Sequence, residues 1–225
     1  VANLADPDVA AVTGRQAKVL GDSKVEEDYR DLIARLQAVE SRLDSTFICH
    51  GPCFAFERAA FHPIAPDSLA DDTEIGVSIR RRGDRVVMDP AIRFVESGVS
   101  TFGKRRMRKD RRAMGLVQLL ARNRDLLGRV RRYGRIVLPF NWWFMIVSPW
   151  LSVAITALAT VTAVHLLGLA GLILHVLAGL LLWLGQRDAL GPFQPLHAVV
   201  DAQISLLVAQ VRLAIGDATG TWAID

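Results

Sequence analysis

The sequence predicts an α/β domain followed by a region of transmembrane helices. Over residues 1–102, segments typical of strands and helices alternate, and charged residues, Pro and Gly are mixed with short apolar runs. From Ile136 the chain carries no charged residue until Arg187, which is typical of membrane-spanning segments. We therefore divide the chain into an α/β part (1–102), a basic amphipathic part (103–135) and a membrane part (136–225).

The α/β part opens with a predicted strand and a predicted helix. Val9–Val19 (VAAVTGRQAKV) is rich in Val, which favours a strand. Ser23 and Glu26 have the spacing of a capping box, at the start of a segment whose apolar residues recur every three or four positions. An amphipathic helix is expected there.

A second strand, a second helix and two short strands complete the expected α/β order. Residues 47–58 (FICHGPCFAFER) predict a buried strand interrupted at Gly51-Pro52. In DSLADDTEIG, Asp71 or Asp72 is expected to begin a helix that runs through Ile79. Residues 84–90 (DRVVMDP) and 91–97 (AIRFVES) predict the two short strands.

The cysteines and histidines give no metal or redox signature. Cys49 and Cys53 have a C-x3-C spacing that matches no common zinc or redox motif, so free buried thiols in a reducing compartment are expected. His165 and His175, ten residues apart, lie on different faces of a helix and are interpreted as packed neutral side chains.

Residues 103–135 carry thirteen Lys and Arg against two Asp, while their leucines keep helical spacing. A basic amphipathic helix beside apolar spans indicates contact with an anionic membrane surface. Nucleic acid is the usual alternative partner of such a basic run. Because no aromatic residues interleave and apolar spans follow at once, we predict membrane lipids and no nucleic acid.

Three apolar segments are expected to cross the membrane. The first runs from about Phe140 to Val164 and has Trp residues at one end; the second ends at Gly185. The third, from Leu196, contains Asp201 and other polar residues, so it either spans with these facing its neighbours or lies partly at the interface; we predict that it spans. Basic residues before the first span place the α/β part in the cytoplasm, in a multi-pass inner-membrane protein.

The linear order of several segments resembles the C-terminal half of a membrane-bound family 2 glycosyltransferase, the family that includes the cellulose, chitin and hyaluronan synthases. These segments are EEDYRDLIARLQAVES, GPCFAFERAAF, ADDTEIGVSIRRRGDRVVMDPAIRFVES and RRAMGLVQLL, followed by apolar spans. The resemblance implies that the α/β part is an incomplete nucleotide-diphospho-sugar transferase domain of the GT-A type. The chain begins with Val and has no signal peptide pattern, and we expect it to be part of a longer protein.

The resemblance places the acceptor-site carboxylates of the family in ADDTE. Asp72 matches the general base that accepts a proton from the attacking sugar hydroxyl, and Asp71 and Glu74 flank it. Both aspartates could instead serve only to cap the helix. In GPCFAFER, the resemblance implies that Gly51 and Cys53 bind the acceptor, the glycine letting the backbone approach a sugar; a bent core strand is the alternative.

The family's interfacial Gln-x-x-Arg-Trp motif corresponds to RKDRR. Arg111 takes the place of the Arg that contacts the donor diphosphate, and Arg112 stands where the family has Trp. The loss of the Trp argues against a processive polymerase, which stacks a growing chain.

The resemblance further implies a nucleotide-sugar donor, most commonly a UDP-sugar, a glycan or lipid-linked acceptor, and Mg²⁺ or Mn²⁺. No Asp-x-Asp metal motif of the family is identified in this sequence, so its metal ligands and most of the nucleotide pocket are expected upstream of Val1. The chain alone is then expected to be inactive. Two alternatives stay open: a non-catalytic membrane adaptor that keeps the fold without binding a donor, and an unrelated basic membrane-surface protein.

Overall fold

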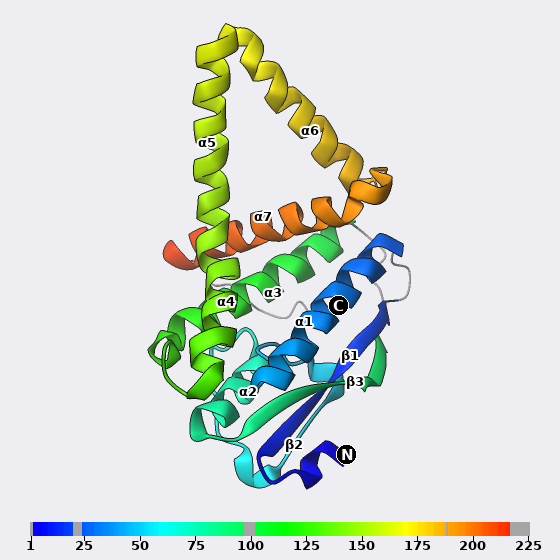
Figure 1. Cartoon of the computed structure of the whole chain (residues 1–225), viewed down its shortest axis with the longest axis vertical. Coiled ribbons are helices and arrows are strands. Elements are labelled where there is room, and N and C mark those ends of the chain that lie inside the picture. Colours follow the sequence, from blue (N-terminus) through cyan, green and yellow to red (C-terminus); the bar gives the residue numbers. More distant parts are fainter. Residues whose placement is uncertain (1, 20–23, 97–101, 188, 217–225) are drawn as a thin grey trace.

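The computed structural model describes residues 2–19, 24–96, 102–187 and 189–216. Its lower part is a three-stranded sheet of order β2-β1-β3 (Figure 1). The central strand β1 (Val9–Val19) is antiparallel to β2 (Phe54–Phe56) and parallel to β3 (Arg85–Glu96). The strand predicted at Val9–Val19 is confirmed.

Two strand predictions were wrong in detail. The predicted strand over residues 47–58 is reduced to β2, because Gly51–Cys53 forms a 3-10 turn with Pro52 in it. The two short strands predicted around Pro90 are one continuous strand, β3. Its pairing with β1 skips from Gly14–Asp89 to Arg15–Arg93, so that Pro90, which has no N–H to donate, lies in a bulge.

Helices α1 (Lys24–Leu43) and α2 (Asp71–Arg82) pack beside the sheet. The capping residue predicted for α1, Ser23, lies outside the described residues. Helix α2 begins at Asp71, as predicted, and carries its acids in the first turn and Arg80, Arg81 and Arg82 in the last turn. This charge order stabilises the helix through its dipole.

The basic helix α3 (Phe102–Arg122) buries the apolar face of its second half inside the protein, whereas Met107 in its first half is exposed. Contact of this helix with a membrane surface stays a prediction. The buried residues pack in one core with Phe47, Val77 of α2 and residues of the later helices; they are Ala113, Met114, Val117, Leu119 and Leu120. Burial of this face fixes α3 to the α/β part, because removing apolar surface from water favours the packed state.

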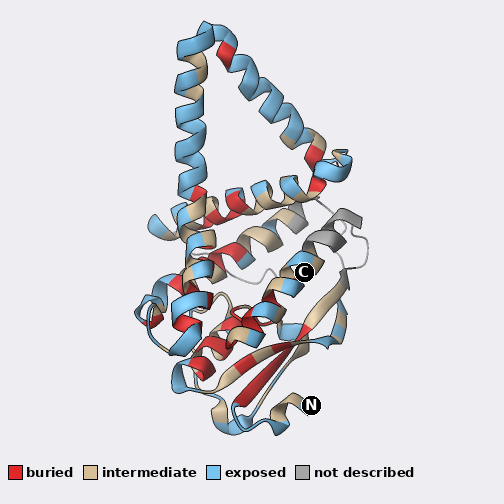
Figure 2. Ribbon diagram, in the orientation of Figure 1, coloured by how far each residue is buried: buried red, intermediate tan, exposed pale blue. Residues whose placement is uncertain are grey.

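The chain then forms a tall helical hairpin and a crosswise helix. Helix α4 (Leu138–Trp142) leads through a π-helical turn into α5 (Ser148–Leu167), and α6 (Ile173–Gln186) returns after a short 3-10 turn. Helix α7 (Gln194–Ala214) runs across the base of this hairpin and above α3 (Figure 1). Helices α5 and α6 are exposed along almost their whole length (Figure 2).

Within the described residues, two helical stretches are long and apolar enough to cross a membrane, judged by length and composition. They are Tyr133–Gln186 and Gly191–Ala214, and 6% and 22% of their most apolar 18-residue windows are buried. The first contains α5 and α6, which diverge from the turn that joins them (Figure 1) and correspond to two of the predicted apolar segments.

Buried polar contacts connect α1 to α2 and to the start of the helical region. Arg80 of α2 binds Asp44 through two hydrogen bonds, Nε to Oδ1 at 2.6 Å and one terminal NH2 to Oδ2 at 2.9 Å. Burial alone would raise the pKa of Asp44, but the hydrogen bonds and charge of Arg80 outweigh it and lower that pKa. Asn141 of α4 donates to Glu40 of α1 at 2.7 Å, and burial raises the pKa of Glu40.

Candidate functional site

Asp72 lies in the first turn of α2 with both carboxylate oxygens held by the protein. Its Oδ1 accepts the backbone N–H of Thr73 at 2.7 Å, which satisfies one of the free donors of a helix start. Its Oδ2 accepts the backbone N–H of Gly51 at 2.8 Å, from the turn that precedes β2. Asp72 therefore does more than bind its own helix, because its Oδ2 also holds the turn at Gly51.

Gly51 and Asp72, both predicted site residues, are brought together. A Cβ placed on Gly51 would lie 3.2 Å from Oδ2 of Asp72, so the glycine allows this close approach. Thr73 adds a second connection, because its hydroxyl accepts the N–H of Cys49 at 3.3 Å. The Asp72 carboxylate is therefore fixed relative to the turn at residues 49–53.

The other predicted acceptor-site residues lie around this carboxylate in different roles. Asp71 is exposed at the first position of α2. Glu74 accepts the N–H of Ala65 at 3.3 Å and so holds the preceding loop. Cys53 has a free, half-buried thiol, and its backbone carbonyl accepts the hydroxyl of Thr13 at 3.2 Å. Cys49 also has a free thiol, which is buried.

Helix α3 holds the loop that leads into Asp71 and Asp72. Gln118 accepts the N–H of Leu69 at 3.2 Å and donates to the carbonyl of Asp67 at 3.3 Å, and Arg122 forms an ion pair with Asp67. A Cβ on Gly115 would lie 2.7 Å from the carbonyl oxygen of Leu69, so glycine permits this contact. The basic helix and the candidate base thus belong to one packed unit.

The basic residues of α3 fall on two faces. Arg106 and Lys109 form ion pairs with Asp201 of α7. Arg108 and Arg112, one turn apart, both form ion pairs with Glu96 at the end of β3, at 3.2 and 3.1 Å. Arg111, half-buried, shares the second face by helical spacing. Arg112, one of the two predicted diphosphate-binding arginines, therefore lies at the carboxyl end of β3.

His50 lies between the two groups of candidate residues. Its pKa is lowered by burial first and by the positive charge of Arg112 second, while Asp72 and Glu96 act in the opposite direction. Its ring packs 5.6 Å from that of Phe94 and lies 3.3 Å from the Gln37 side chain. These interactions place His50 within electrostatic range of both Asp72 and Arg112.

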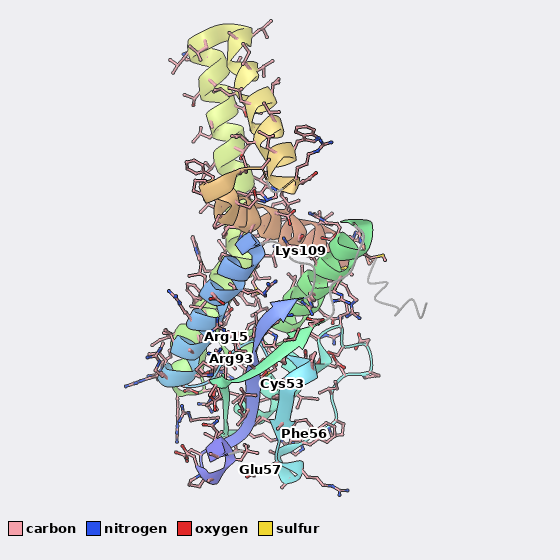
Figure 3. All side chains as sticks on the ribbon, turned by 90° about the vertical axis from the view of Figure 1, so that its right-hand side faces the viewer. Arg15, Cys53, Phe56, Glu57, Arg93 and Lys109 are labelled. Atoms are coloured by element: carbon pink, nitrogen blue, oxygen red, sulfur yellow. The ribbon has the colours of Figure 1, made fainter. Side chains whose placement is uncertain are left out.

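Two residues of this region were missed by sequence reasoning. Glu96 follows an apolar run at a strand end, a position that could have marked it, whereas only the fold brings His50 to Asp72. Figure 3 shows Arg15 of β1 and Arg93 of β3 close together on the paired strands.

The described residues contain no group of three or more His, Cys, Asp or Glu that could hold a metal ion. Asp72, the best-placed carboxylate, already accepts two backbone N–H groups and has no second acid beside it in a chelating arrangement. The residues present thus do not fit a divalent metal site, and no chemical step at this site is derived through a metal.

Comparison with known proteins supports a common fold and family. A mannosyltransferase from Pyrobaculum calidifontis, solved with GDP-mannose and Mn²⁺, superimposes with a TM-score of 0.73 at 23% sequence identity. The match covers 99% of this chain and 56% of that one, so this chain spans little more than half of the mannosyltransferase. Among curated proteins no sequence matches significantly. The model of glycosyl transferase family group 2 matches residues 1–185, and the chain therefore belongs to this family.

Proposed function

We propose that this chain is part of an inverting membrane glycosyltransferase, which moves a sugar from a nucleotide-sugar to a hydroxyl group of a glycan or lipid-linked acceptor. The observation that carries the proposal is the carboxylate of Asp72, held by Gly51 and Thr73, in a chain of glycosyl transferase family group 2. The reaction would take place at the cytoplasmic face of the membrane, in the synthesis of a polysaccharide or cell-envelope glycan.

Asp72 acts as the general base in this proposal. Each carboxylate oxygen has two acceptor positions, and Oδ2 uses one of them for Gly51. The acceptor hydroxyl donates to the other, and its proton passes to Asp72 as its oxygen bonds to the anomeric carbon. The bond from that carbon to the diphosphate breaks at the same time, and its electron pair leaves with the nucleoside diphosphate. A single displacement of this kind inverts the anomeric centre.

The arginines of α3 stabilise the departing diphosphate. Arg111 and Arg112 are the residues we assign to this role, since guanidinium groups bind phosphate oxygens through paired hydrogen bonds. Arg112 is half-exposed and already oriented by Glu96. We further propose that the donor's metal ion and most of the nucleotide are held by residues outside this chain, which is supported by its 56% coverage of the mannosyltransferase.

The donor experiment tests the proposed reaction directly. Membranes containing the complete protein are incubated with radiolabelled UDP-sugars and GDP-mannose, each with Mg²⁺, Mn²⁺ or EDTA. We expect metal-dependent transfer of one sugar class, with a UDP-sugar as the donor. GDP-mannose is included as the alternative donor because the similar mannosyltransferase binds it. Nucleotide binding without transfer from any donor would contradict the proposal, and absence of both would favour the adaptor alternative.

Gly51→Ala tests the geometry around the base. The added Cβ would press on Oδ2 of Asp72, only 3.2 Å away, and shift the carboxylate from its position. Because misplacement of a catalytic group by about 1 Å costs on the order of 10²-fold and the shift needed here is smaller, we expect a transfer rate lowered by up to about 10-fold. Initial rates at saturating donor measure this. Gly179→Ala, on exposed α6 where a Cβ meets nothing within 4 Å, is the matched control.

A further inference from the structure

Helix α7 packs along the α/β part of the molecule. In Figure 1 it runs crosswise to α5, in the layer between the α5–α6 hairpin and α3. It contacts α3 most extensively and also contacts α1 and the bases of α5 and α6. Leu206 and Ala209 of α7 are buried in the same core as the apolar face of α3.

The polar residues of α7 bind groups that belong to this layer. Asp201 forms ion pairs with Arg106 and Lys109 of α3. Gln203 accepts the hydroxyl of Ser148, the first residue of α5, at 2.8 Å. Gln210 accepts the indole N–H of Trp150 at 2.9 Å, and Trp side chains favour the membrane interface.

The opposite face of α7 is apolar and exposed. At 100° per residue, four of its exposed apolar residues lie within about 80° of one another, whereas Ser205 and Ala209 lie on the other side. We call these four the α7 stripe: Leu196, Val200, Ile204 and Val211. The α7 stripe faces away from the buried Ser205 and Ala209.

We infer that α7 lies in the plane of the membrane interface and does not cross the bilayer. The α7 stripe contacts acyl chains of the leaflet that faces the α/β part, while α5 and α6 cross the bilayer as a pair. This inference replaces the spanning arrangement expected for the third apolar segment, and it rests on the proposed membrane location. Residue 215 then stays on the same side of the membrane as the α/β part.

Electrostatics favours the in-plane arrangement. If α7 crossed the bilayer while keeping its contacts with α3, Asp201, Arg106 and Lys109 would enter the hydrocarbon together. Charged groups there are costly, and α3 is fixed by its buried apolar face to the core of the α/β part. An amphipathic helix with one apolar stripe meets no such cost when it lies at the interface.

Cysteine labelling in the full chain tests the inference. Single cysteines are placed at three exposed positions in a Cys49→Ser/Cys53→Ser background: Ala189→Cys before α7, Ile215→Cys after it, and Leu169→Cys at the hairpin tip. Each variant is exposed to a membrane-impermeant maleimide in inverted and in right-side-out vesicles. Resistance to alkaline carbonate extraction is measured on the same membranes.

Each outcome separates the in-plane arrangement from the alternatives. We expect Ala189→Cys and Ile215→Cys to label in inverted vesicles only, and Leu169→Cys to label in right-side-out vesicles only. Labelling of Ile215→Cys from the side opposite to Ala189→Cys would overturn the inference, because α7 would then cross. Complete extraction of the protein by carbonate would overturn the proposed membrane location itself, which is a different result.

Discussion

Replacing Arg80 with Met is expected to lower the free energy of unfolding by about 3–5 kcal/mol, because the change leaves the Asp44 carboxylate buried without its cation. The Arg80 and Asp44 side chains are only 2% and 6% exposed, and two hydrogen bonds of 2.6 and 2.9 Å join them. Arg80 also donates to the carbonyl of Gly83 at 3.0 Å, and Asp44 accepts the N–H of Tyr133 at 3.2 Å. The substitution therefore breaks contacts among α1, α2 and the start of the helical region.

The neighbouring ion pair supplies the control. Arg81 binds Asp125 with a similar two-bond geometry, but the two side chains are 42% and 47% exposed. Arg81→Met is expected to cost at most about 1 kcal/mol, because water and salt screen an exposed pair. Thermal unfolding in detergent followed by circular dichroism compares the variants, and a midpoint lowered on the order of 10 °C is expected for Arg80→Met alone. Equal midpoints in the two variants would show that the buried pair does not stabilise the fold.

Asp72→Asn is expected to lower the transfer rate by about 10²–10⁴-fold, the usual contribution of a general base. The amide oxygen of Asn can accept only one of the two backbone N–H groups, of Gly51 and Thr73, that Asp72 binds, so one of these contacts is lost together with the ability to take a proton. Asp72→Glu keeps the charge but moves it, and a smaller loss is expected. Initial rates in membranes measure both, with Asp125→Asn, an exposed residue that binds Arg81, as the control.

The elements that depend on local sequence could be predicted. The Val-rich strand at Val9–Val19 and the helix start at Asp71 follow from β-propensity and from the preference of carboxylates for a helix start. The interruption at Gly51-Pro52 was predicted from these two residues, but the reduction of the strand to Phe54–Phe56 and the bulge at Pro90 were not, because both depend on how β1 pairs with its neighbours.

The arrangement of α3 and α7 could not be derived from composition. A basic amphipathic pattern does not tell whether the apolar face meets lipid or another part of the same chain, and in the second half of α3 it meets the core. The polar residues of α7 suited either a spanning or an interfacial helix, and the choice depends on ion pairs to residues nearly a hundred positions earlier.

The candidate site was predictable only where the residues are neighbours in sequence. The ADDTE segment indicated Asp72, but its contact with Gly51 joins residues 21 positions apart, and the ion pairs of Glu96 with Arg108 and Arg112 depend on how α3 returns to the end of β3. His50 had no distinguishing pattern at all. Its place near Asp72 and Arg112 follows from the turn that precedes β2.

The central claim is that Asp72 removes the proton from the acceptor hydroxyl, and donor binding and transfer measured on the same membranes test it most directly. Wild type and Asp72→Asn are compared for the dissociation constant of the donor nucleotide-sugar and for the rate of transfer at saturating donor. We predict an unchanged dissociation constant with transfer nearly abolished. Undiminished transfer in Asp72→Asn would contradict the account and would leave ADDTE as the start of a helix.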